Sequence, residues 1–436
     1  MVVARRHLLA IASDASPTIG IMQNDPDVLI LGGGVIGLAC AHYLLQAGRS
    51  VRIVECGRTG AATSHGNCGT ITPSHAPPLA APGPVLKALK WMASPDAPLY
   101  VKPRPDPALA YWLLRFALRC NRNDWRQAGL AKAALLQQSR TLIEDLVTRS
   151  NLDCEFRATG VRYIYRDTSE FEQACRELPE LAEFGIATGI INPADLARDE
   201  PALRPGMAGA IEFPGDASLR PDRYCAELAR LVLEQGGIIE EGVTVTGFVA
   251  ERDRLVGVTT SAGERRGRDV LAAFGPWSPA LLRQLGLRLP IQPGKGYSIT
   301  YSRPVLAPRV PLLLKERSVC VTAWGSGFRL GSTMEFSGYD DSLNRRRLDA
   351  LERAANEYLR EPVGPVKQEE WFGWRPMTWD DLPILGAAPG WKNLWLATGH
   401  GMLGITLSAA TGQMLADLIC GRETAVDPRP YRADRF

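Results

Sequence analysis

The chain has 436 residues, 45% of them hydrophobic and 22% charged, and its formal net charge at pH 7 is only +3. This composition is typical of a globular protein with two or three domains. It disfavours a nucleic-acid-binding protein, because no basic block with interleaved aromatic residues occurs. The nine cysteines are odd in number and lack C-x-x-C spacing, which disfavours a disulfide framework or a metal site and favours a reducing cytoplasm.

The N-terminal residues 1–24 are expected to form a disordered extension. Their apolar run at 8–12 imitates a signal peptide, but the run is short and Asp14 follows soon after it. No apolar run in the chain is long enough to cross a bilayer. A cytoplasmic protein is therefore expected, and a peripheral contact with the inner face of the membrane stays open.

Residues 28–37 read VLILGGGVIG and predict a buried strand followed by the start of a helix. Gly32, Gly34 and Gly37 have the G-x-G-x-x-G spacing. In that motif they permit a tight turn, the approach of a pyrophosphate, and close packing of helix on strand. The N-terminus of such a helix also offers unpaired N–H groups and a favourable dipole to phosphates.

A second strand is predicted over residues 50–55 and closes on Glu55. A carboxylate at this point can accept hydrogen bonds from the hydroxyls of an adenosine ribose. An ordinary βαβ turn is the alternative, but it does not explain the acidic residue. The order strand, glycines, helix, strand and acid therefore predicts a dinucleotide-binding unit.

The rest of the chain alternates between strand and helix patterns. Residues 56–84 read as a polar, glycine-rich stretch that enters a proline-rich loop. The later elements are expected in this order: helices over 108–120 and 128–150, a strand near 161–165, a helix over 169–184, short strands over 237–258, a buried strand at 270–274, a strand-rich region over 291–335, an amphipathic helix over 341–360, and a final strand, loop and helix.

Five segments together resemble one protein family, the D-amino-acid oxidase superfamily. The opening segment, VLILGGGVIGLACAHYLLQAGRSVRIVE at 28–55, is similar to its FAD-binding fingerprint. GWRPMTWDDLPILG at 373–386 resembles its late substrate-and-flavin motif, and LWLATGHGMLGITLSAATG at 394–412 its C-terminal flavin-contacting segment. AAPGPVLKALKWM at 80–92 and IQPGKGYSIT at 291–300 narrow the resemblance to bacterial D-amino-acid dehydrogenases.

The resemblance implies an enzyme of mixed α/β fold that uses FAD as its cofactor. A Rossmann-like FAD domain and a separate mixed β-sheet substrate domain are expected, as in D-amino-acid oxidase. The FAD domain would comprise residues 25–80, 201–280 and 366–436, and the substrate domain residues 81–200 and 281–365.

Arg375 is the first candidate for a catalytic residue. A guanidinium matches a carboxylate with two parallel hydrogen bonds, so it fixes an amino-acid substrate better than a point charge does. The alternative is a structural arginine paired with Asp380 or Asp381. The resemblance favours the functional reading, because the arginine of that motif is the family's carboxylate anchor.

Three further positions have both a functional and a structural interpretation. His400, in the glycine-rich run 398–404, could shuttle the amine proton or merely hydrogen-bond a carbonyl, and the second role is favoured. Tyr297 could reach the substrate, although strand tyrosines are more often packing residues. His65 lies where the family passes the flavin ring, and non-covalent FAD is favoured over attachment to this histidine.

The predicted cofactor-binding residues come from both the glycine motif and the resemblance. They are Gly32, Gly34, Val35, Ile36, Gly37, Glu55, Cys56, Ser64, His65, Gly66, Asn67, Val245, Gly275, Trp277, Gly373, Gly399, His400, Gly401, Met402, Leu403, Gly404 and Thr406.

The activity that the resemblance implies is oxidation of the Cα–N bond of a D-amino or cyclic D-imino acid by hydride transfer to flavin N5. The dense aromatics beside Arg375 favour a compact, ring-like side chain, with D-proline or D-hydroxyproline first. The electrons would pass to a quinone or another acceptor. Two alternatives stay open, an amine or sarcosine-type oxidase that uses oxygen and a flavoprotein that serves RNA modification or assembly. An NAD enzyme is disfavoured by the second glycine-rich segment.

Overall fold

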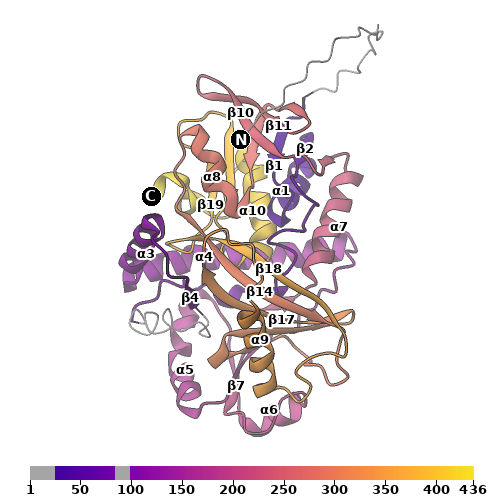
Figure 1. The fold of residues 1–436 in the computed structure, drawn as a ribbon, viewed down its shortest axis with the longest axis vertical. Helices are drawn as coiled ribbons and strands as arrows, with labels where there is room; N and C mark the ends of the chain where they lie inside the picture. The colour runs from indigo at the N-terminus through magenta and orange to yellow at the C-terminus, as the bar shows by residue number, and fades with distance from the viewer. Residues whose placement is uncertain (1–24, 84–98) are drawn as a thin grey trace, which may run out of the picture.

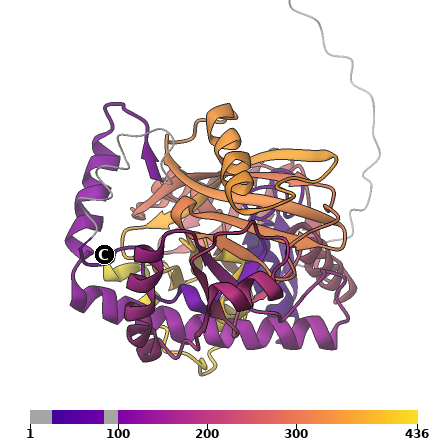
Figure 2. The ribbon, with the colours of Figure 1, turned by 90° about the horizontal axis from the view of Figure 1, so that it is seen from below.

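The computed structural model describes residues 25–83 and 99–436. The predicted extension at 1–24 and most of the motif at 80–92 lie outside the described residues. Two large β-sheets form the two halves of the molecule, one above the other in Figure 1, and the long helix α4 (Arg122–Arg149) runs beside both. Viewed from below in Figure 2, α4 lies along one side of the molecule.

The upper half contains a six-stranded sheet in the order β19-β20-β13-β1-β2-β9. All neighbours are parallel except the pair β19 and β20. The strands are β1 (Val28–Leu31), β2 (Val51–Val54), β9 (Ile238–Glu240), β13 (Asp269–Ala272), β19 (Ile384–Ala387) and β20 (Leu394–Thr398).

Both faces of this sheet are covered, which is why β1 reads as a continuous apolar run. One face packs against helices, which are α1 (Val35–Gln46), α7 (Pro221–Glu234) and α10 (Gly404–Ile419). The other face packs against a small antiparallel sheet, which comprises β10 (Val245–Glu251), β11 (Arg254–Thr260) and β12 (Gly263–Arg266).

The lower half contains a nine-stranded mixed sheet in the order β18-β14-β17-β16-β15-β5-β7-β6, with β4 paired to β17. Helix α9 (Arg345–Tyr358) covers one face of it. The strands are β4 (Leu99–Val101), β5 (Val161–Tyr165), β6 (Gly189–Ile191), β7 (Gly209–Phe213), β14 (Ile291–Tyr301), β15 (Leu312–Leu314), β16 (Val319–Trp324), β17 (Gly327–Phe336) and β18 (Lys367–Thr378).

Smaller elements connect the halves. A two-stranded ladder joins β3 (Thr70–Ile71) to β8 (Ala217–Ser218). The other α-helices in the described part of the chain are α3 (Pro107–Arg119), α5 (Thr168–Leu181), α6 (Pro193–Asp199) and α8 (Ser278–Leu282).

The predicted fold class is confirmed, since a Rossmann-like sheet and a separate mixed sheet are both present. The predicted helix at 128–150 begins earlier, at Arg122, because the Asn121 side chain accepts a hydrogen bond from the Asp124 N–H and caps it. Two strands from segments predicted for the FAD domain, β7 and β18, belong to the nine-stranded sheet. A strand's own sequence does not say which sheet it joins, so the division into domains stays a prediction.

Candidate active site

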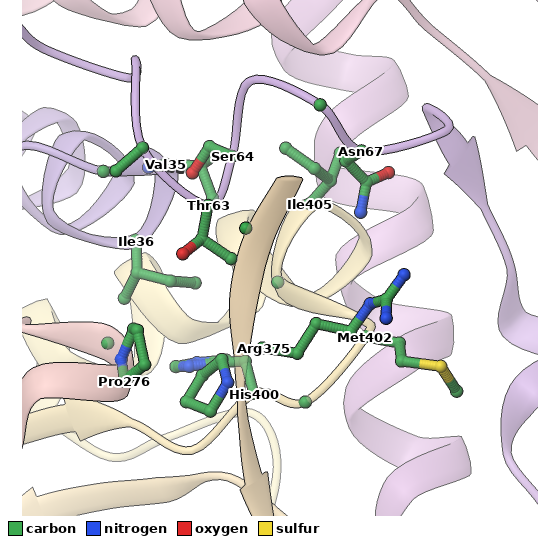
Figure 3. A pocket seen from close by; sticks show the side chains of 18 of the residues that line it. Val35, Ile36, Thr63, Ser64, Asn67, Pro276, Arg375, His400, Met402 and Ile405 are labelled. Carbon is green, nitrogen blue, oxygen red and sulfur yellow. Dashed lines mark hydrogen bonds between the residues drawn. The ribbon is translucent and has the colours of Figure 1, made fainter. Parts of the chain in front are cut away.

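A cavity of about 510 Å³ lies between the two large sheets. This volume is within the range of cofactor and ligand sites. Figure 3 shows Val35 and Ile36 on one side of it and Asn67, Arg375 and Met402 on the other. Most predicted site residues line it, namely Gly32, Gly34, Val35, Ile36, Glu55, Cys56, Ser64, Gly66, Asn67, Val245, Gly275, Trp277, Tyr297, Gly373, Arg375, His400, Gly401, Met402, Leu403 and Gly404.

The three glycines of the first motif meet different constraints. Gly32 has φ +114°, and a Cβ there would lie 2.5 Å from the Ala273 carbonyl oxygen. A Cβ at Gly37 would lie 1.9 Å from the Gly32 carbonyl oxygen, so this glycine permits the close packing of α1 on β1. A Cβ at Gly34 would meet only the Ser64 Oγ, at 3.6 Å. Gly34 therefore borders open space, which a cofactor phosphate fits and a larger side chain would fill.

The N-terminus of α1 faces the same space. Gly34 caps the helix without any side-chain hydrogen bond, and the Val35 N–H donates to the Ser64 Oγ at 3.1 Å. The following N–H groups of the first turn have no partner within the helix. Unpaired donors at a helix N-terminus suit a pyrophosphate.

Glu55 follows β2 and organises the turn beside it. Its Oε2 accepts from the Gly33 N–H at 2.7 Å, and its Oε1 accepts from the Gly57 N–H at 2.8 Å. Oε1 also accepts from the Cys56 Sγ at 3.3 Å, so the remaining acceptor capacity is on Oε2. The position and remaining acceptor capacity fit a ribose diol.

Arg375 reaches the opposite wall of the cavity from β18. Its Nη1 donates to the Thr333 carbonyl oxygen at 2.7 Å. The guanidinium lies over Gly296 of the neighbouring strand, where a Cβ would come within 2.3 Å of it. Burial lowers the pKa of Arg375, although a guanidinium keeps its charge at any physiological pH.

The structural alternative for Arg375 does not hold in the structure. Asp380 pairs with Arg435, with 2.8 Å between Oδ2 and Nε, and Asp381 pairs with Lys132. Among the described residues no carboxylate forms an ion pair with Arg375. A half-buried cation in the cavity wall with one carbonyl partner is suited to receive a carboxylate from a ligand.

The glycine-rich segment after β20 forms one end of the cavity. Gly399 and Gly401 have φ of +75° and +55°, which turn the chain into the N-terminus of α10. His400 is buried there, with its Nε2 3.0 Å from the Thr411 Oγ1. Burial lowers its pKa to about 3, so the imidazole is neutral at physiological pH. The partner is a hydroxyl and not the expected carbonyl, and the role of His400 stays a prediction.

Tyr297 borders the cavity, but its hydroxyl is engaged elsewhere. It donates to the Glu335 Oε2 at 3.1 Å, and the ring packs in the core beneath α9. Of the aromatic residues near Arg375, only some line the cavity. Trp371 lines the cavity, whereas Phe372, Trp374 and Trp379 do not line it.

Four predicted cofactor residues do not line the cavity, and each has another contact. The His65 Nε2 lies 2.8 Å from the Glu369 Oε1, and the Thr406 hydroxyl donates to the Thr70 carbonyl oxygen. The other two are Gly37, which packs on Gly32, and Gly399, which turns the chain before His400.

Several lining residues were not predicted from the sequence. They are brought to the cavity by the loop at 63–75 and by β5, β15 and β16. Among them the His75 Nε2 lies 2.7 Å from the Tyr163 hydroxyl. No local motif marks such residues, because the pairing of β5 with β15 joins segments far apart in the sequence. The same segments also contribute Thr63, Cys68, Thr70, Thr72, Val161, Leu313 and Cys320, while Pro276 comes from residues 275–277 and Ile405 from α10.

In residues 25–83 and 99–436, no helix is both long and apolar enough to span a membrane. In the same ranges, no cluster of histidine, cysteine and acidic side chains could hold a metal ion.

Comparisons with known proteins agree with this geometry. The sequence pattern described as FAD dependent oxidoreductase matches residues 27–418. The D-amino acid dehydrogenase of Paramagnetospirillum magneticum is 37% identical over 94% of this chain and 98% of its own. The D-amino acid dehydrogenase of Xanthobacter autotrophicus is 34% identical over 94% of this chain and 99% of its own.

Solved structures show the same fold at lower identity. Glycine oxidase from Geobacillus kaustophilus has a TM-score of 0.75 at 24% identity and covers 94% of this chain and 99% of its own. L-proline dehydrogenase from P. horikoshii has a TM-score of 0.74 at 19% identity and covers 94% and 98%. Fold, cavity and sequence define an FAD-dependent oxidoreductase. Within that class, the chain belongs to the D-amino acid dehydrogenase family.

Proposed function

We propose that this chain oxidises the Cα–N bond of D-amino acids and favours cyclic D-imino acids such as D-proline or D-hydroxyproline. FAD supplies the hydride acceptor, at N5, and an external quinone or similar acceptor takes the electrons. The observation that carries the proposal is Arg375, a half-buried cation in the cavity wall with no carboxylate partner among the described residues. The names of the full-length relatives support the substrate class.

In this proposal Arg375 binds the substrate carboxylate through two parallel hydrogen bonds. Its carbonyl bond to Thr333 and the space left by Gly296 fix the guanidinium before substrate arrives. Such preorganisation limits the entropy lost in orienting Cα–H toward the flavin. Gly34, Glu55 and the N-terminus of α1 would hold the dinucleotide at the other end.

The apolar wall beside Arg375 supports a compact, uncharged substrate side chain. Trp371, Leu313 and Met402 are apolar residues of the cavity lining, and Trp371 lies on the same face of β18 as Arg375. The Trp371 ring lies against the backbone, since a Cβ at Gly66 or Gly373 would approach it to 2.0 or 2.1 Å. A cyclic secondary amine also suits the chemistry, because loss of hydride yields a stable cyclic imine.

The test is a panel of D- and L-amino acids assayed with an artificial electron acceptor. D-Proline and D-hydroxyproline should give the largest kcat/KM, followed by small neutral D-amino acids, and carboxylate-free amines should be poor substrates. Faster turnover of L-enantiomers or of carboxylate-free amines would refute the assignment. Reoxidation of the reduced flavin should be faster with a quinone than with oxygen, and the reverse result would indicate an oxidase.

We also propose that α3 contacts a membrane surface, where a quinone would be available. Three apolar side chains on one side of α3 are strongly exposed, Tyr111 at 53%, Leu114 at 58% and Leu118 at 63%. Flotation with anionic vesicles should recover the wild type, and Leu114→Ser with Leu118→Ser should abolish recovery. Val305→Ser, at a loop position 97% exposed, is the matched control. Equal recovery of all three proteins would refute this contact.

A further inference from the structure

Two cysteines lie side by side in the wall of the cavity. Cys320, on β16, is the cross-strand partner of Gly331 on β17. Cys68 comes from the loop before β3, and its Sγ lies 2.5 Å from the place where a Cβ of residue 331 would be. The Cys68 sulfur therefore occupies the side-chain position next to Cys320, and the glycine at 331 leaves room for it.

This arrangement brings the two sulfurs within reach of a bond. The Cys68 Sγ lies near the position of a Cβ at residue 331, and cross-strand Cβ positions are about 4.5–5.5 Å apart. The two thiols are close enough for each to shift the pKa of the other, downward for Cys68 and upward for Cys320, while the Cys320 Sγ also lies 3.8 Å from the Thr322 Oγ1. Cys68 is followed by Gly69, with φ +74°, in a loop connection rather than in a strand. A small shift of this loop would suffice.

The charges around the pair make the two thiols unequal. The buried Arg329 donates from Nη1 to the carbonyl oxygens of His65 and Asn67, at 2.8 and 2.7 Å, and so holds the loop that carries Cys68. The hydrogen bond from Cys320, and then the charges of Arg329 and Arg375, lower the pKa of Cys68. The pKa of Cys320 is raised. Cys68 is thus the nucleophile and Cys320 the resolving thiol.

The buried hydroxyl of Ser298 is a third group beside the two cysteines. Ser298 pairs with Gly331 on the side opposite to Cys320, so its side chain adjoins the Cys68 sulfur. Its residue is 1% exposed, and its Oγ has no hydrogen-bond partner among the described residues. A buried hydroxyl without a partner is costly. An oxygen added to Cys68 would accept its hydrogen bond.

We propose that Cys68 and Cys320 form a reversible oxidation site for peroxides in the wall of the cavity. The Cys68 thiolate attacks one peroxide oxygen, the O–O bond breaks, and hydroxide leaves, giving a sulfenic acid. Cys320 then attacks the Cys68 sulfur, the S–S bond forms, the S–O bond breaks, and water leaves. In total two thiols are oxidised and one hydrogen peroxide is reduced to two waters. Thiol reductants reverse the step.

The bond would change the site that the proposed function uses. It would pull Cys68 from its place beside Gly331 and fix the loop to β16, next to Leu313 in the apolar wall. Substrate oxidation should then fall by roughly tenfold or more, since small displacements at a reacting centre are costly. The chemical step itself does not depend on the substrate assignment.

The test treats the FAD-loaded protein with hydrogen peroxide and maps its peptides without reduction. We expect one linked peptide pair that joins Cys68 to Cys320, restored to free thiols by dithiothreitol. Cys68→Ser and Cys320→Ser should each abolish it, and Cys320→Ser should instead accumulate a Cys68 sulfenic acid that dimedone traps. Cys175→Ser, on α5, is the control and should keep the linked pair.

The outcomes separate this proposal from the proposed function. Preferential oxidation of other cysteines, or a linked pair that persists in either variant, would overturn the oxidation site whatever the substrate is. A correct linked pair in a protein that does not oxidise D-amino acids would uphold the oxidation site and refute the proposed function. A linked pair with unchanged activity would overturn the effect on the substrate wall.

Discussion

The two ends of the cavity are built in different ways. The end beside α1 comes from one continuous βαβ unit, in which Gly34, Val35 and Glu55 meet through local turns. The end beside Arg375 comes from a loop and from six strands of the nine-stranded sheet, β5, β14, β15, β16, β17 and β18, which are distant from one another in sequence. The first end is thus a local motif, and the second exists only after the nine-stranded sheet has formed.

This difference predicts different responses to substitution. Changes at the local end should affect cofactor binding without disturbing substrate recognition by any protein that still holds FAD. Changes at the assembled end should leave FAD bound and alter turnover.

The largest effect is expected for Gly34→Leu. A side chain here has room in the folded chain but occupies the space assigned to the pyrophosphate. The purified variant should be folded and colourless, by circular dichroism and flavin absorbance. Gly215→Leu, another position with open space around its Cβ, should stay yellow. Stoichiometric FAD in Gly34→Leu would refute the placement.

Arg375→Ala should keep FAD but lose substrate recognition. Removing one partner of a desolvated charge pair should lower kcat/KM by about 2–5 kcal/mol equivalents, mostly through KM. The kcat/KM of Arg375→Lys should lie between those of the wild type and Arg375→Ala, because an ammonium lacks the two parallel donors. Arg345→Ala, at a side chain 61% exposed, is the control. Normal kinetics of Arg375→Ala would exclude it as the anchor.

Asp216 should make the assembled end sensitive to pH. Its carboxyl accepts from the Ser74 N–H and Oγ at 3.0 and 2.6 Å, next to His75 of the cavity wall. Burial raises its pKa from 3.8 to about 7. The folded protein therefore retains a proton that the unfolded chain has lost. Stability should fall as pH rises from about 4 to 7 and be constant above.

Asp216→Asn removes this titration and tests its sign. The free energy of unfolding above pH 7 should rise by at most about 4 kcal/mol, with little change near pH 4. Thermal melts at several pH values would measure it. Asp153→Asn, at a side chain 80% exposed, should keep the wild-type pH profile. A wild-type profile in Asp216→Asn would contradict the raised pKa.

The smallest effect is expected for Glu55→Gln. The amide retains one acceptor oxygen but loses the second, so FAD affinity should fall by roughly tenfold, about 1.4 kcal/mol. Equilibrium dialysis of FAD would measure the change, and kcat at saturating FAD should be unchanged. Glu264→Gln on β12 is the surface control. A larger effect on kcat than on FAD affinity would contradict the expectation that the local end affects only cofactor binding.

Almost all the lining residues of the local end were predicted from the sequence, because the spacing within one βαβ unit determines its geometry. At the assembled end, a motif predicted Arg375 correctly as a cavity residue. The aromatic residues around Arg375 were all predicted to line the cavity together. Alternate residues of a strand face opposite sides, so Trp371 shares the cavity face with Arg375 while Phe372 and Trp374 face away. That alternation was readable in WFGWR.

Other residues of the assembled end could not be found in this way. Tyr163 reaches the cavity through the parallel pairing of β5 with β15, and Cys320 through the pairing of β16 with β17. Neither has a local signal in the sequence. Such neighbours follow from strand order, which one sequence does not specify.

The ion pairs that Asp380 and Asp381 form with cations from other segments affect which charged molecules are attracted to the cavity. Lys132 of α4 and Arg435 near the C-terminus neutralise the two acids that follow β18. The field of Arg375 is therefore not cancelled locally, and it should draw carboxylates toward the cavity while repelling simple ammonium ions. Because salt shortens the range of this attraction, substrate capture should slow as ionic strength rises. The protein would thus discriminate between carboxylates and simple amines by long-range electrostatics, before either binds.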